Sequence, residues 1–108
     1  MITTHVLDTS RGAPAAGMSV LLELRGSGEW MTIGRANTDA NGRVTSFGSV
    51  TLGPGTYRLT FDTSEYHKAN GVAPFFPEVT VAFEVVSGAH YHVPLLLSPF
   101  GYSTYRGT

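Results

Sequence analysis

Two histidines near the end of the chain have the spacing that most directly suggests chemistry. His90 and His92 stand in AHYHVPLLL, a segment predicted to form a β-strand, in which alternate residues point to the same face with backbones about 6.5–7 Å apart. An imidazole with the ordinary pKa of ~6.5 can act as a general acid or a general base near neutral pH. The pair therefore predicts a shared site on one face of a sheet.

Zinc binding is a second interpretation of the same pair. An H-x-H pair on a strand can ligate zinc, which takes about three protein ligands in a catalytic site and four in a structural site. His5 would supply a third ligand, but no further residue has an evident place as the fourth. The chain has no cysteine, which excludes thiolate ligands, disulfides and a cysteine nucleophile. We therefore expect no metal and no cofactor, and for any one histidine alone the plain alternative is a half-exposed strand residue with ordinary hydrogen bonds.

Other reactive side chains stand at two further places. Arg43 directly follows TDANG, a turn signal in which Gly42 enters the left-handed region freely, so the turn would aim the arginine. The closing YRGT places a phenol, a guanidinium, a hydroxyl and a carboxylate within four residues. No glycine-rich phosphate loop, G-x-S-x-G elbow or H-E-x-x-H helix is present. The residues alone thus predict a site built from histidine, arginine and tyrosine.

The segments that must position these residues are mostly short and alternate apolar with polar residues, the pattern of an antiparallel sandwich or barrel with one buried face. Eight such segments are ITTHVLD, MSVLLELR, EWMTIGRAN, RVTSFG, TYRLTFD, EVTVAFEVV, AHYHVPLLL and FGYSTYRG. DTSEYHKANG instead predicts a helix of about two turns, with an N-cap within residues 62–64 and a stop at Asn70-Gly71. His67 lies in this helix outside every motif, so we expect its replacement to be nearly silent. Residues 1–108 therefore form one all-β domain, a sandwich of two sheets with one short helix.

Length, charge and hydropathy narrow the classes of partner. The 108 residues fit one domain. The net charge is −1, with 7 basic and 8 acidic residues and no basic stripe, so nucleic acid is not an expected partner. The start of the chain lacks a signal-peptide pattern, and no apolar run approaches the ~18–20 residues of a membrane span. We expect a soluble, cytoplasmic protein that does not bind membranes, with enough weakly polar surface for self-association.

Two longer stretches carry a resemblance to a known family. THVLDTSRGAPAAGM near the start and HYHVPLLLSPFGYSTYRGT at the end resemble the signature segments of 5-hydroxyisourate hydrolase, the transthyretin-related enzyme of urate breakdown. NGRV and FFPEV lie where that family has similar segments, so the resemblance covers essentially the whole chain. The chain departs from the family's ending at Thr108, where the family has serine. Threonine keeps the hydroxyl and adds a methyl group.

The resemblance implies a fold, an assembly and a reaction. The fold is a transthyretin-like sandwich of two four-stranded sheets. The assembly is a homotetramer with its active sites at the interface where two dimers meet. The reaction, in purine degradation, is attack of water on the ring lactam carbonyl of 5-hydroxyisourate, which gives 2-oxo-4-hydroxy-4-carboxy-5-ureidoimidazoline.

The resemblance also implies which residues form the site. The histidine of THVLD is His5, the arginine after the turn is Arg43, and the second histidine of HYHVP is His92. The terminal hydroxyl falls on Thr108 and the tyrosine of the closing motif on Tyr105. His5 and His92 would share the base and acid roles, and Arg43 would bind a carbonyl or a developing oxyanion. Thr108 would complete the catalytic set, and Tyr105, with His5 and Arg43, would contact the substrate.

Two functions of other classes stay open at this point. A transthyretin-like protein that only binds a small ligand would have the same fold, since one fold hosts many functions. Such a channel would have an apolar lining, whereas His5, Arg43 and His92 favour hydrolysis. A metal-binding accessory sandwich would rest on the H-x-H pair alone. The sequence therefore favours the hydrolase.

Overall fold

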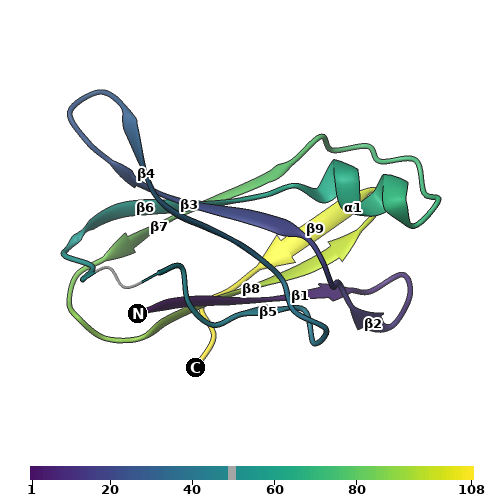
Figure 1. The fold of residues 1–108 in the computed structure, drawn as a ribbon, viewed down its shortest axis with the longest axis horizontal. Helices are drawn as coiled ribbons and strands as arrows, with labels where there is room; N and C mark the ends of the chain where they lie inside the picture. Colours follow the sequence, from purple (N-terminus) through teal and green to yellow (C-terminus); the bar gives the residue numbers. More distant parts are fainter. Residues whose placement is uncertain (49–50) are drawn as a thin grey trace.

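Two β-sheets packed face to face make up the protein (Figure 1), in a computed structural model that describes residues 1–48 and 51–108. In the first sheet the strands follow the order β2 (Ala13–Pro14), β1 (Ile2–Asp8), β8 (Tyr91–Ser98) and β9 (Gly101–Thr104), and β5 (Arg43–Val44) also pairs with β1. In the second sheet the order is β4 (Trp30–Asn37), β3 (Ser19–Arg25), β6 (Gly55–Phe61) and β7 (Val79–Val85).

The predicted sandwich with one short helix is confirmed, and each of the eight predicted segments contains a strand. The expectation of wholly antiparallel pairing is wrong at one place, because β1 and β8 pair in parallel. The first sheet has one strand beyond the expected four, because Ala13 and Pro14 pair with Asp8 and Leu7. The segment RVTSFG contributes only the two residues of β5. Both differences concern two-residue strands that pair with β1, each of which directly follows a turn.

The core lies between the sheets and takes every second residue of the long strands. On β3, Val20 and Leu22 are opposite Phe61 and Leu59 of β6, and all four side chains are buried. The first sheet contributes Ile2, Val6, Val44, Tyr91, Val93, Leu95 and Leu97. Burying one such side chain stabilises the fold by roughly 1.5–3 kcal/mol relative to leaving it exposed. The residues that point outward from the first sheet are not needed to fill the core, so they are available to form a functional site.

The helix α1 (Thr63–Ala69) lies at one end of the sandwich, between β6 and β7 in the chain (Figure 1). Its predicted start is confirmed, since the Asp62 side chain accepts a hydrogen bond from the backbone N–H of Glu65. Its predicted end is confirmed at Asn70. Among the described residues, no helix has the length and apolar character needed to cross a bilayer. The cytoplasmic location stays a prediction.

A buried carboxylate ties this helix to the end of β1. Asp8 is 2% exposed, and its Oδ2 accepts a hydrogen bond of 2.8 Å from the hydroxyl of Tyr66. Its Oδ1 accepts from Ser10 and from the backbone N–H of Arg11. Burial acts to raise the pKa of Asp8, but the hydrogen bonds from Ser10, Tyr66 and Arg11 outweigh it and hold the pKa below 3.8. The ionised carboxylate is therefore the form that the fold stabilises.

We predict that Tyr66→Phe lowers the free energy of unfolding at pH 7 by about 1.5–3 kcal/mol, the usual contribution of a hydrogen bond to a charged group. Because the folded state lowers the pKa of Asp8, the contribution of this carboxylate is present above pH 3.8 and is lost as pH falls through the folded pKa. The cost of Tyr66→Phe should therefore shrink in strong acid. Urea denaturation at several pH values measures it, with Thr56→Val, which removes a solvent-exposed hydrogen bond from a hydroxyl to the Glu84 carboxylate, as matched control. Equal costs for the two variants would contradict the prediction.

Candidate active site

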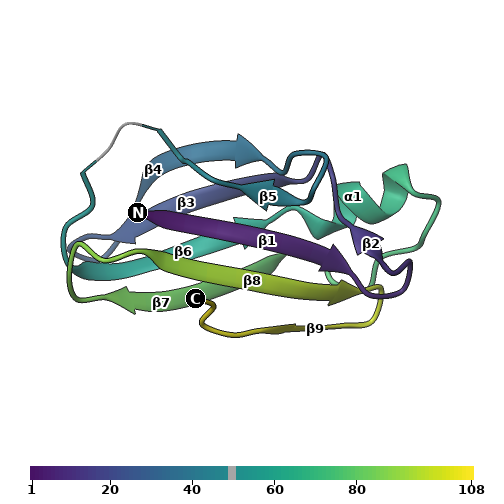
Figure 2. The same cartoon turned by 90° about the horizontal axis from the view of Figure 1, so that it is seen from below.

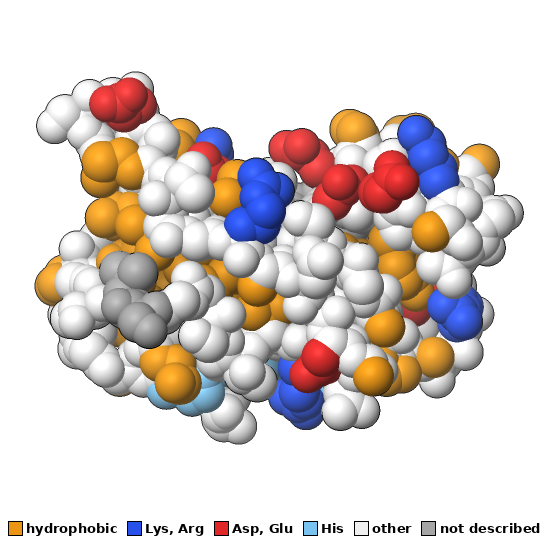
Figure 3. Space-filling view, viewed as in Figure 1, with side chains coloured by type: hydrophobic (Ala, Val, Ile, Leu, Met, Phe, Trp, Pro, Cys, Tyr) orange, Lys and Arg blue, Asp and Glu red, His pale blue; other side chains and the backbone are white. Residues whose placement is uncertain are grey.

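A parallel pairing between the first and the eighth strand positions the candidate site (Figure 2). β1 and β8 run side by side in the same direction. Their register sets Thr3 opposite His92 and His5 opposite Pro94. Val6, next to His5, is fully buried in the core, and side chains alternate along a strand. Thr3, His5 and His92 therefore face outward from the sandwich. Figure 3 shows histidine side chains at the lower rim of the molecule, on the side of the first sheet.

Arg43 reaches the same neighbourhood from β5. It lies opposite His5 in an antiparallel pair with β1. The turn before it contains Gly42 with φ of 76°, which confirms the predicted left-handed turn, and the Asp39 side chain accepts a hydrogen bond of 2.9 Å from the backbone N–H of Arg43. A Cβ atom on Gly42 would collide with the carbonyl oxygen of Val6. Glycine at this position therefore lets the turn pack directly against β1 and present the arginine.

The end of the chain folds back onto His92. The backbone N–H of Gly107 donates a hydrogen bond of 2.8 Å to the carbonyl oxygen of His92, and the two residues form an isolated β-bridge. A Cβ atom on Gly107 would lie 2.5 Å from Cδ2 of the His92 ring and 3.2 Å from Cγ of Pro94. The absence of a side chain at Gly107 thus allows the close approach that carries Thr108 to the edge of the site.

Three of the five predicted site residues, Arg43, His92 and Thr108, line one shallow hollow of about 190 Å³. Its other described lining residues are Thr3, Thr4, Val44, Thr45 and His90. His5 does not line this hollow but lies beside it on the same face, with its Nε2 2.8 Å from the carbonyl oxygen of Asn41. The structure therefore gathers one arginine, two histidines and four threonines, Thr108 among them, around one hollow, with a third histidine adjacent.

Tyr105 lies in a different hollow of the single chain. It is 57% exposed. It lines a groove of about 260 Å³ whose walls come from β7 on one side and from β8 and residues 104–106 on the other. The described lining of this groove also contains Val81, Ala82, Phe83, Glu84, Tyr91, His92, Val93, Thr104 and Arg106. Among the residues that the structure describes, only His92 is common to this groove and the Arg43 hollow. Contact between Tyr105 and the substrate therefore stays a prediction.

Thr3 is a participant that the search for reactive side chains missed. Its Oγ1 lies 2.8 Å from Nδ1 of His92 and 2.7 Å from Nε2 of His90. The two rings stand with centroids 6.2 Å apart, which confirms the predicted same-face arrangement of His90 and His92. The signal that would have found Thr3 is the alternation in ITTHVLD, because residues 3 and 5 of that strand share a face.

The environment of His92 lowers its pKa below 6.5. Burial of the half-buried ring is the largest cause, because it disfavours the charged imidazolium. The guanidinium of Arg43 and the neighbouring His90 and His5 also oppose a further positive charge, and a hydrogen bond with the backbone of Thr3 acts in the other direction but is outweighed. His92 is therefore neutral at pH 7, the state that a general base needs.

The zinc interpretation lacks its further ligands in the described part of the chain. Across residues 1–48 and 51–108, no three His, Asp or Glu side chains gather in a way that could hold a metal ion. His90 and His92 instead meet at the hydroxyl of Thr3. The pair therefore fits hydrogen-bonded acid–base residues better than metal ligands.

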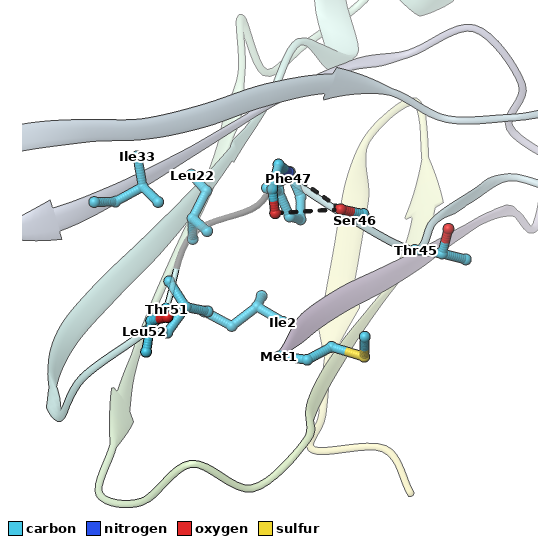
Figure 4. Close-up of a pocket in the computed structure, with 10 residues that line it drawn as sticks. Met1, Ile2, Leu22, Ile33, Thr45, Ser46, Phe47, Thr51 and Leu52 are labelled. Atoms are coloured by element: carbon cyan, nitrogen blue, oxygen red, sulfur yellow. Dashed lines mark hydrogen bonds between the residues drawn. The ribbon is translucent and has the colours of Figure 1, made fainter.

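A further hollow of about 220 Å³ lies between the two sheets (Figure 4). Its lining combines the apolar side chains of Met1, Ile2, Leu22, Ile33, Phe47 and Leu52 with the polar side chains of Thr45, Ser46 and Thr51, together with Gly48. Its described lining contains no histidine, arginine or carboxylate side chain. The chemistry of the outward face of the first sheet therefore has no counterpart here.

Comparison with known proteins covers nearly the whole chain. The model of the HIUase/Transthyretin family matches residues 2–107. A probable 5-hydroxyisourate hydrolase of Caenorhabditis elegans is 49% identical, covering 99% of this chain and 81% of that protein. The structure of Klebsiella pneumoniae 5-hydroxyisourate hydrolase is 36% identical with a TM-score of 0.89, covering 99% of this chain and 98% of the other. Sea bream transthyretin in complex with thyroxine is 31% identical with a TM-score of 0.93, covering 99% and 94%. Both a hydrolase and a thyroxine-bound transthyretin are thus similar to this chain, and the residues of the site must distinguish them.

We predict that His92 titrates below pH 6.5 in solution, because burial and the charge of Arg43 both disfavour its protonated form. Removing the guanidinium in Arg43→Gln should move this pKa upward, toward the ordinary value. NMR titration of the histidine ring signals measures both effects, and Arg35→Gln, on the opposite sheet, is the matched control. An unchanged titration in Arg43→Gln would show that the arginine does not act on His92.

Proposed function

The chain belongs to the HIUase/Transthyretin family, and from this premise we propose that it is a hydrolase that opens 5-hydroxyisourate to 2-oxo-4-hydroxy-4-carboxy-5-ureidoimidazoline. The single observation that carries the proposal is the hollow that holds Arg43, His92 and Thr108 with His5 beside it. These are the groups that hydrolysis of a cyclic amide requires: a base, an acid and a donor for the oxyanion.

Ligand binding without reaction is the second candidate, and the likeness to sea bream transthyretin with thyroxine favours it. A site for an apolar ligand is lined mainly by hydrophobic and aromatic side chains. In the described lining of the Arg43 hollow, every residue except Val44 is polar. The polar lining favours the hydrolase.

The attacking water is activated by His92 in the proposed mechanism. His92 is neutral at pH 7 and its Nδ1 is occupied by Thr3, so Nε2 is the ring nitrogen left for a water molecule. Nε2 takes a proton from the water as its oxygen bonds to the lactam carbonyl carbon. General base catalysis of this kind contributes roughly 10²–10⁴-fold in rate.

Arg43 and His5 assist at two other atoms of the substrate, the carbonyl oxygen and the leaving nitrogen. The guanidinium of Arg43 donates hydrogen bonds to the carbonyl oxygen as it becomes an oxyanion, an effect of roughly 10²–10³-fold for one donor. The carbon–nitrogen bond of the ring then breaks, and His5 gives a proton to the leaving nitrogen. Since Arg43 and His5 are opposite one another on β5 and β1, their side chains project side by side from the same face, and we propose that they contact the carbonyl oxygen and the ring nitrogen of one amide. The hydroxyl of Thr108 orients the water or the substrate.

We further propose that four copies assemble with the outward face of the first sheet at the interface between dimers. Two leucines of the run VPLLLSPFGY, Leu95 and Leu97, are buried in their own core, so they need no partner. Phe100 is 75% exposed and Tyr102 is 44% exposed, and Leu96 is only partly buried. These side chains support the proposal, because a neighbouring subunit would remove them from water.

We predict that His5→Ala, Arg43→Ala and His92→Ala each lower kcat/KM by at least ~10²-fold, the scale of losing a base, an acid or an oxyanion donor. The melting temperature should change little, since all three side chains face outward from the core. A spectrophotometric assay on freshly generated 5-hydroxyisourate measures the loss. Turnover like that of the wild type in His92→Ala would contradict the assignment of the base.

The control for these variants is an exposed arginine of the other sheet, Arg35→Ala, which should keep full activity.

His67 is unsuitable as a control, because the expectation that its replacement is nearly silent needs correction with respect to stability. Its side chain is 3% exposed and its Nε2 has no hydrogen-bond partner within the described residues. It lies on the buried side of α1, so His67→Ala leaves a cavity and lowers stability.

We predict that deleting residues 105–108 abolishes hydrolysis and leaves a tetramer, because the deletion removes Thr108 and the Gly107 contact to His92 but none of the buried core. Thr108→Ser should keep the rate or raise it modestly, since the hydroxyl is retained and one methyl group is lost. The hydroxyisourate assay and light scattering measure the two effects. Full activity of the shortened chain would exclude a role for the chain end, and a fully active monomer would exclude a site shared between subunits.

A further inference from the structure

One hydroxyl, that of Thr3, lies between two imidazoles. Thr3 Oγ1 is 2.8 Å from Nδ1 of His92 and 2.7 Å from Nε2 of His90. Thr3 is 8% exposed and His92 is partly buried, whereas His90 is exposed to solvent. The three side chains therefore form a short hydrogen-bonded chain that runs from the hollow to bulk water.

A hydroxyl has a single proton, so Thr3 can donate to only one of the two rings and must accept from the other if both bonds form. When His92 carries its proton on Nδ1, it donates to Thr3, and Thr3 donates to Nε2 of His90. When Thr3 donates to Nδ1 of His92, the proton of that ring is on Nε2. Because Nδ1 faces Thr3, only the first arrangement leaves an unprotonated nitrogen of His92 for a base.

We propose that Thr3 is a positioning residue that fixes His92 as its Nδ1–H tautomer and relays the proton gained in the reaction to His90. The proposal rests on the function proposed above, in which Nε2 of His92 takes a proton from water. As it does so, the Nδ1 proton moves to Thr3 Oγ1 while the hydroxyl proton moves to Nε2 of His90. One proton enters the relay at Nε2 of His92 and one arrives at Nε2 of His90, which becomes the imidazolium and then releases a proton to bulk water.

The charges around His92 give the relay its driving force. A base histidine is commonly held by a carboxylate on its second nitrogen, which stabilises the imidazolium when it forms. The described groups that act on the charge of His92 are instead Arg43, His90 and His5, which are cationic or become so on protonation. Moving the positive charge through Thr3 to the exposed His90 places it in water, away from the half-buried position beside the guanidinium.

The first test needs no substrate. The ¹⁵N chemical shifts of the histidine ring nitrogens at pH above 7 report the tautomer of His92 in the intact protein. We expect Nδ1 to be protonated in the wild type and in Thr3→Ser, which keeps the hydroxyl, and we expect loss of this preference in Thr3→Val, which has the same shape without it. A His92 protonated at Nε2 in the wild type would overturn the proposal whatever the enzyme does.

The second test separates the two roles of Thr3 by activity. Thr3→Val should lower kcat by about 10²-fold, the low end of a base contribution, with KM nearly unchanged, and Thr3→Ser should restore most of the rate. His90→Gln keeps a hydrogen-bonding partner for Thr3 but cannot accept the proton, so it should keep the His92 tautomer and lower kcat by about 10-fold, a part of that contribution.

These outcomes distinguish the relay from the proposed function. A wild-type protein that turns over hydroxyisourate while Thr3→Val and His90→Gln are fully active would exclude the relay and leave the hydrolase intact. Absence of turnover in the wild type would exclude the function, and the ring shifts would still decide the tautomer. Should Thr3→Val unfold, as a shifted melting temperature would reveal, Thr3→Ala provides the same loss of hydroxyl with less bulk and is judged by the same shifts.

Discussion

The parallel pairing of β1 with β8 is the constraint on which the site depends. It joins residues 89 positions apart, such as Thr3 and His92, and a slip of one residue would turn every side chain of a strand to the opposite face. Buried groups fix the register: Val6 and Leu95 are opposite one another within the core, and the Thr4 hydroxyl donates to the carbonyl oxygen of Val93 at 2.6 Å. Apolar packing on one face of the sheet thus determines hydrogen-bond distances between polar groups on the other.

The segment HVLDTS places side chains on both faces of the first sheet. His5 points outward beside Arg43, while Asp8, three residues later, is buried and binds Tyr66 of α1. Thr9 then donates from its backbone and its hydroxyl to the carbonyl oxygen of Leu97, which fixes the far end of β1 against β8. The same few residues therefore hold the strand in place and present a reactive imidazole, so a change at Asp8 would disturb His5 through the strand rather than by contact.

The sequence was sufficient for features that depend on neighbouring residues and insufficient for those that depend on register. The long strands follow from alternation, the start of α1 from Asp62, and the turn before Arg43 from Gly42. The contact of Thr3 with both His90 and His92 arises only when two distant strands pair. Likewise, nothing local indicates that Tyr105 faces the groove beside β7 while Thr108 reaches the Arg43 hollow. The family resemblance supplied the site residues, and the strand pairing explains why Arg43, His92 and Thr108 meet around one hollow with His5 beside it.

The excess of basic side chains distinguishes this site from an ordinary polar groove. An arginine and three histidines stand on one face, and the described groups that act on His92 contribute positive charge alone. Such a field suits a substrate rich in carbonyl oxygens and a transition state in which negative charge develops on oxygen. It also works against the same base once that base is protonated, because the described charges that act on an imidazolium at His92 are those of Arg43, His90 and His5, which oppose it. The positive charge that lowers the barrier to attack therefore also requires that the proton be removed from His92 after the attack. The exposed ring of His90, which is linked to His92 through the hydroxyl of Thr3, is positioned to accept that proton.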